Sequence, residues 1–178
     1  MKSFARLLVP GILMALAVLA PSTAWAEAKS QSNTVTVSPV LTLTAPAAAS
    51  ITHDGEDTNQ AFTAASWGIE SNNAAGATVT FAVSDVFVHS VANSYKADVK
   101  LDLALSTSDS GSGWTVTTAT DTTDYAAATA DLAASVVASS TAAGDAALDL
   151  SVTFVSSDHS LLAAGDYAVT VTGTLTAK

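Results

Sequence analysis

The stretch Asn33-Thr-Val-Thr-Val-Ser-Pro-Val-Leu-Thr-Leu-Thr-Ala-Pro46 alternates between apolar and polar side chains along most of its length. Alternation with a period of two is typical of a β-strand with one buried face, because successive side chains of a strand point to opposite sides. The apolar face of this stretch holds Val35, Val37, Pro39, Leu41 and Leu43. A strand so close to the N-terminus can pair within its own domain or with a neighbouring molecule, and its alternation alone does not decide between the two.

The residues upstream of this stretch have the features of a secretory signal peptide. Lys2 and Arg6 give a positive start, residues 7–20 are apolar, and Ala24-Trp25-Ala26 supplies the small-x-small pattern that precedes cleavage. The apolar run is shorter than the roughly 20 residues that a membrane-spanning helix needs, and Pro10 interrupts it. We therefore expect residues 1–26 to be removed, leaving a secreted product without a membrane span, either extracellular (including the cell surface) or periplasmic.

The expected mature chain is one domain preceded by a short N-terminal segment. About 150 residues suffice to bury a core without covalent staples, and the chain contains no cysteine. We assign residues 27–46 to an N-terminal strand or donor arm and residues 47–178 to a single β domain.

The charge balance of the mature chain disfavours nucleic-acid partners. After removal of Lys2 and Arg6, four lysines and no arginine stand against sixteen acidic residues, a formal charge near −12. Phosphate recognition depends on clusters of lysine and arginine, which this chain lacks. The acidic balance disfavours anionic membrane surfaces for the same reason.

Period-two alternation recurs along the rest of the chain and predicts an all-β fold. Two-faced segments separated by Gly, Ser, Asn and Asp turns favour an antiparallel β-sandwich, Ig-like or jelly-roll-like. The expected inward rows are Val79-Phe81-Val83, Val99-Leu101-Leu103-Leu105, Trp114-Val116-Thr118, Leu148-Leu150-Val152-Phe154 and Tyr167-Val169-Val171-Leu175.

Residues 125–143 do not follow this pattern. They consist almost entirely of Ala, Thr, Ser, Val and Asp, and alanine favours helix over strand. Leu132, Val136 and Val137 fit one face of a short helix, so we expect a helical crossover around residues 126–143, with a strand near 133–139 as the alternative.

The sequence contains no recognisable catalytic constellation. His53, His89 and His159 are widely separated and lie in no metalloprotease frame, and no Gly-x-Ser-x-Gly elbow is present. We therefore expect a protein that is not an enzyme and needs no cofactor. The one candidate metal site is a calcium site at Asp54, Glu56 and Asp57, because Ca²⁺ prefers oxygen ligands from a flexible loop.

Two segments resemble those of secreted bacterial pilin-like or coat-type β-sandwich surface proteins. Residues 161–176 contain an Ala-Gly-x-Tyr turn followed by a long alternating Thr/Val strand, and residues 66–80 resemble a tryptophan-bearing hairpin. The chain departs from chaperone-assembled pilins because it has no cysteine pair and because Ala177 replaces a penultimate tyrosine.

The resemblance implies a subunit of an extracellular filament, pilus-like fibre (fimbrium) or biofilm matrix. In such homo-polymers an N-terminal strand of one subunit completes the sheet of the next. Applied to this chain, the inserted row would be Val35, Val37, Leu41 and Leu43, and the accepting edge would be Tyr167, Val169, Val171 and Leu175. The simpler alternative is that residues 34–44 pair in cis, and Pro39 could also divide them into a free arm, 34–37, and a home strand, 40–44.

A monomeric binding module for carbohydrate or a surface partner is the alternative function. Such modules usually display aromatic side chains on one face, and the candidates are Trp67, Tyr95, Trp114 and Tyr125. Burial of the two tryptophans would weaken this alternative.

Overall fold

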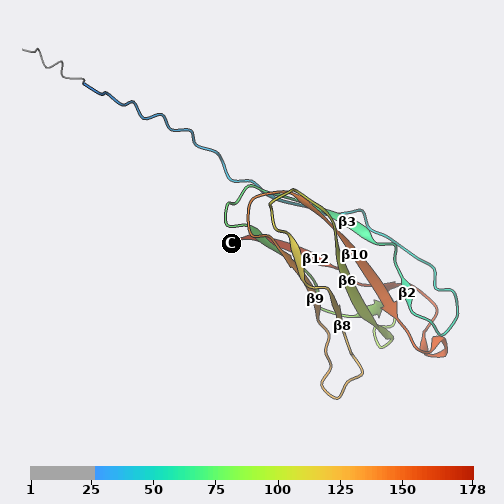
Figure 1. Cartoon of the computed structure of the whole chain (residues 1–178). Helices are drawn as coiled ribbons and strands as arrows, with labels where there is room; N and C mark the ends of the chain where they lie inside the picture. Colours follow the sequence, from blue (N-terminus) through green and yellow to red (C-terminus); the bar gives the residue numbers. More distant parts are fainter. Residues whose placement is uncertain (1–26) are drawn as a thin grey trace, which may run out of the picture. The chain divides into compact units, whose positions relative to one another are not determined.

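The computed structural model describes residues 27–178, so the expected signal peptide lies outside the described residues. The chain separates into two units, Met1–Thr36 and the β domain Val37–Lys178 (Figure 1). Within residues 27–178 the regular structure is β, apart from one 3-10 turn, η1 (His159–Leu161). No helix in this part of the chain has the length and hydrophobicity needed to cross a membrane.

The larger sheet of the β domain, which we call sheet A, is antiparallel and centred on its two longest strands. Its order is β1-β3-β10-β6-β5-β11, with β2 also pairing with β10 and β8 with β6. Ten residues of β10 pair with β6, and this is the longest strand pair of the sheet. The strands of sheet A are β1 (Leu41–Thr44), β2 (Gln60–Ala61), β3 (Ala65–Ser71), β5 (Phe87–His89), β6 (Lys96–Ser108), β8 (Thr120–Thr122), β10 (Ala146–Val155) and β11 (Tyr167–Ala168).

The smaller sheet, sheet B, is also antiparallel and covers part of sheet A. Its order is β12-β4-β9-β7. Its strands are β4 (Ala77–Val83), β7 (Thr115–Thr118), β9 (Ala134–Ser139) and β12 (Thr172–Ala177). In β4 every second residue is buried, as alternation requires of a strand with one face on the core.

The apolar rows of the two sheets meet in one core. Trp67 of β3 packs against Phe81 of β4 with ring centroids 4.8 Å apart, which joins the two layers. Val79, Phe81, Leu101 and Leu148 are fully buried. The predicted all-β, antiparallel sandwich-like fold is thereby confirmed.

The expected helical crossover around residues 126–143 is wrong. Residues 134–139 form β9, which pairs with both β4 and β7. Ala134, Val136 and Ala138 point into the core, where small and β-branched side chains fit between the sheets. Pairing on both edges therefore overrides the helix preference of alanine. Residues 123–133 form the loop that projects beyond the sheets between β8 and β9 (Figure 1).

The expected long C-terminal strand is interrupted. Tyr167 and Ala168 pair with β5 in sheet A, whereas Thr172–Ala177 pair with β4 in sheet B. Residues 169–171 connect the two sheets and belong to neither. The Thr/Val alternation continues through this crossing, which is why the sequence predicted one strand.

Candidate functional site

The N-terminal segment, which we call the arm (residues 27–36), contains no strand (Figure 1). All of its side chains are exposed, and Val35 retains 87% of its accessible surface. Val37, the first residue of the β domain, retains 77%. Two valines that alternate with threonines in the sequence are thus left in water, where burying their apolar surface against a partner would be favourable.

The chain enters its own sheet only after Pro39, at a point fixed by Asn72. The Asn72 side chain accepts a hydrogen bond from the Val40 amide at 2.7 Å and donates one to the Ser38 carbonyl at 2.8 Å. Leu41–Thr44 then pair with β3. Residues 40–44 therefore pair in cis, and the clamp at Asn72 separates them from the arm.

β1 and β12 approach each other at one side of the domain. The segment that follows β1 and the segment that precedes β12 then diverge. A Cβ at Gly173 would lie 2.9 Å from the side chains of both Leu43 and Trp67, which shows how close the approach is. Residues 45–52 continue from β1 and residues 171–167 lead away from β12. The two segments run in opposite directions and leave a space between them.

The first part of this space, which we call the apolar hollow, has a volume of about 470 Å³. Its walls are residues 45–49 and 168–171. The lining also includes five larger apolar side chains of the core or its margin: Phe62, Trp67, Phe87, Leu150 and Val152. No charged side chain lines it. Phe62 and Val152 are only partly buried here, whereas Trp67, Phe87 and Leu150 are buried, so the margin of the core is partly uncovered along this line.

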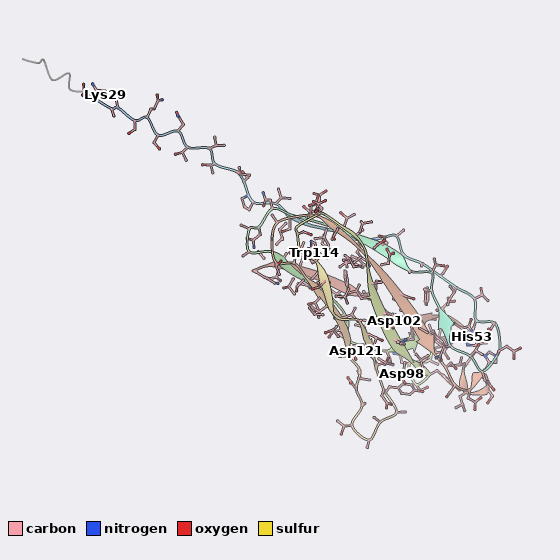
Figure 2. All side chains as sticks on the ribbon, in the orientation of Figure 1. Lys29, His53, Asp98, Asp102, Trp114 and Asp121 are labelled. Carbon is pink, nitrogen blue, oxygen red and sulfur yellow. The ribbon has the colours of Figure 1, made fainter. Side chains whose placement is uncertain are left out.

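The second part, the polar hollow, has a volume of about 640 Å³ and continues from the first. Ala49, Phe62, Phe87 and Tyr167 line both hollows, so together they form one groove. The second part is also lined by apolar side chains, among them Phe154 and Leu162, but it adds the polar side chains of His53, Gln60, His159 and Asp166. Figure 2 shows His53 near one end of the β domain, with Trp114 towards the other.

The backbone on both sides of the groove lies outside the sheets. Residues 45–52 and 169–171 belong to no strand, and none of the loop or turn hydrogen bonds found between backbone groups of residues 27–178 involves them. Tyr167 holds the adjoining turn, since its hydroxyl accepts from the Ala163 amide at 3.0 Å and lies 3.2 Å from the Ala163 carbonyl. Two walls with unpaired amides and carbonyls can accept a further extended strand.

The residues predicted for the subunit interface fall into four places. Val169 and Val171 line the apolar hollow, and Tyr167 lines both hollows. Leu175 lies on β12 opposite Val79, away from the groove lining. Leu41 and Leu43 lie in β1, and Val35 and Val37 are exposed. The larger side chains of the groove lining (Phe62, Phe87, Leu150, Val152) were missed, because their alternation is that of ordinary core residues.

The three candidate calcium ligands do not converge. Asp54 accepts hydrogen bonds from the Glu56 amide at 2.9 Å and the Thr58 hydroxyl at 3.2 Å, whereas Asp57 accepts from the His159 amide at 2.7 Å. Within residues 27–178 no group of three His, Cys, Asp or Glu side chains is placed to hold a metal ion. The hydrogen bond from the Glu56 amide, together with those from Gln60 and Thr58, keeps the pKa of Asp54 below its ordinary value.

Two histidines that are distant in sequence are brought together at the polar hollow. The rings of His53 and His159 stack with centroids 5.0 Å apart, and His53 Nε2 is buried without a hydrogen-bond partner within the described residues. His89, by contrast, has a structural role, since its Nδ1 accepts from the Val91 and Ala92 amides at 3.2 and 3.0 Å.

The tryptophans do not provide a surface for sugar stacking. Trp67 and Trp114 are 9% and 4% exposed, and the Trp114 indole donates to the Gly144 carbonyl at 3.0 Å. Tyr95 and Tyr125 are partly exposed. The carbohydrate alternative thus loses the two side chains on which it most depended.

No family model matches the chain, and neither a curated protein nor a solved structure matches it.

Proposed function

We propose that this protein is a secreted structural subunit of an extracellular filament or matrix, in which the arm of one copy enters the groove of the next. One observation carries this proposal: partly buried apolar side chains at the margin of the core line a groove between two walls of unpaired backbone, in a chain with an exposed alternating arm. The role is one of assembly and not of catalysis.

Both the groove and the arm have the features that strand addition uses. Main-chain hydrogen bonds to the walls would supply affinity, and alternate side chains entering the groove would set the register. Val35 and Val37 would cover Val152 and the adjoining apolar lining, which removes apolar surface from water on both molecules. The clamp at Asn72 leaves the arm free to leave its own domain, because it holds Ser38 and Val40 in place.

Assembly is testable with two double variants that carry the same charge change on opposite faces of the arm. Val35→Asp/Val37→Asp puts carboxylates on the face that enters the groove, whereas Thr34→Asp/Thr36→Asp puts them on the other face. We expect the wild type and the threonine variant to form polymers by light scattering and electron microscopy, and the valine variant to remain monomeric. Deletion of residues 27–36 should have the effect of the valine variant.

The unfolding midpoint of the isolated monomer provides the control. It should be the same for both double variants, since the arm belongs to no strand of its own domain. A wild-type protein that remains monomeric at all concentrations would overturn the proposal and would favour the monomeric binding module.

A further inference from the structure

We infer that the donated strand lies in the groove in one direction only, with Val35 and Val37 in the apolar hollow and Lys29 at the polar hollow. This inference rests on the proposed function and specifies its partner, the arm of a second copy. The strand would then run antiparallel to residues 45–52 and parallel to residues 167–171.

The first argument is the match in polarity along the arm and along the groove. The only large apolar side chains of residues 27–37 are Val35 and Val37, at one end, whereas residues 27–33 are polar or small. The groove differs in the same direction: no charged side chain lines it near Ala45–Ala49, whereas Asp166 joins the otherwise largely apolar lining of the other end. The reverse direction would put Lys29 against apolar side chains, where an unpaired ammonium group is costly.

The second argument is charge. Lys29 is the one cationic side chain of the arm and Glu27 the one acidic side chain, and within residues 27–178 the Lys29 ammonium group forms an ion pair only with the exposed Glu27 carboxylate, at 3.3 Å. Asp166 lines the polar hollow, and Asp54 and Asp57 belong to the adjoining loop. A second copy inserted in the inferred direction brings Lys29 to this acidic end.

The third argument is the unsatisfied group at the polar end. The buried Nε2 of His53 has no hydrogen-bond partner within residues 27–178. The arm carries two carboxamides, Gln31 and Asn33, between its valines and its lysine. In the inferred direction these carboxamides lie towards the polar hollow, where they would offer His53 a hydrogen-bond partner. Six residues of extended chain span about 20 Å, so a strand with Val35 in the apolar hollow reaches this end of the groove with Lys29.

The absence of cysteine from the chain makes the direction measurable by disulfide trapping. Donor copies carry Thr34→Cys or Ser30→Cys, on the face of the arm opposite to the valines. Acceptor copies carry Ala48→Cys, at the apolar hollow, or Thr52→Cys, at the polar hollow, together with Val35→Asp/Val37→Asp to disable their own arms. The four donor and acceptor combinations are mixed, oxidised, and examined on non-reducing gels and by mass spectrometry.

We expect the pairs 34–48 and 30–52 to cross-link about tenfold more than 34–52 and 30–48, because a disulfide requires Cα atoms within about 7 Å. The reverse preference, or equal yields in all four mixtures, would overturn the direction and leave strand donation intact. No cross-link in any mixture, from copies that also fail to polymerise without the cysteines, would overturn the proposed function itself.

Discussion

The two ends of the inter-sheet core are built from the same strands but differ in closure. On β10, Leu148 is completely buried, whereas Val152, on the same face four residues later, is only partly buried and lines the groove. At the Leu148 end, loops complete the core. Ser112 accepts from the Thr141 and Ala142 amides, both at 3.1 Å, and the Asp109 side chain accepts from the Asp145 amide at 3.0 Å.

Around Val152 the closure is less complete, although Phe154, two residues further along β10, is buried again at 7% exposure. The bordering segments, 45–52 and 169–171, are not joined to each other by backbone hydrogen bonds. Both ends are equally apolar along β10, so the difference lies in what covers them and not in composition. Under the proposed function, the arm of a second copy would cover this less completely closed part of the core.

The largest effect should come from truncating the same face of β10 at its two ends. Leu148→Ala leaves a cavity in a closed core and should lower the free energy of unfolding by about 2–5 kcal/mol. Val152→Ala removes a side chain that already contacts solvent and should lower it by about 1 kcal/mol or less. Urea denaturation of the mature protein, followed by tryptophan fluorescence, measures both.

The ranking should reverse when assembly is measured. Val152→Ala should weaken polymer formation in light scattering more than its small effect on the monomer explains, because it removes part of the surface that the arm covers. Equal losses of monomer stability from the two substitutions would mean that the groove is closed in solution.

The two ends of the core also show which features of the fold the sequence predicts and which it does not. Alternation in β4, β6 and β10 predicted the strands and most of their inward faces, because each pattern is local, but Leu105 of β6 was expected to point inward and is exposed. Alternation could not predict that Leu148 is fully buried and Val152 only partly buried. Their neighbours in sequence are alike, and the degree of burial depends on tertiary contacts. At Ala134–Ser139 the expected helix was wrong and its alternative, a strand, was right, because alanine is buried there by two pairing partners that local preference does not reveal.

A smaller effect should come from the loops of the closed end. Gly144 has φ +147°, and a Cβ there would lie 2.6 Å from Ser112 Cβ. Gly144→Ala should therefore cost about 1–3 kcal/mol of strain, with steric overlap added. Gly111→Ala is the matched control, because Gly111 also has a positive φ, +84°, but has open space around its Cβ position. Thermal unfolding of the two variants separates backbone strain from steric overlap. Equal decreases in melting temperature would contradict the tight closure of this end.

The smallest effect concerns the loop at the open end and depends on pH. The pKa of Asp54 is lowered from 3.8, first by the hydrogen bond from the Glu56 amide. A lowered pKa means that the ionised group stabilises the folded loop above pH 3.8 and that this contribution disappears as the pH falls through the lowered pKa. Asp54→Asn should therefore reduce the melting temperature slightly at neutral pH, and the two melting curves should converge in stronger acid. Glu56→Gln removes the same charge from the same loop but leaves the hydrogen-bonded Asp54 carboxylate in place, and it should not lower the melting temperature at neutral pH. If the two variants behave alike, total charge and not the hydrogen-bonded carboxylate orders this loop.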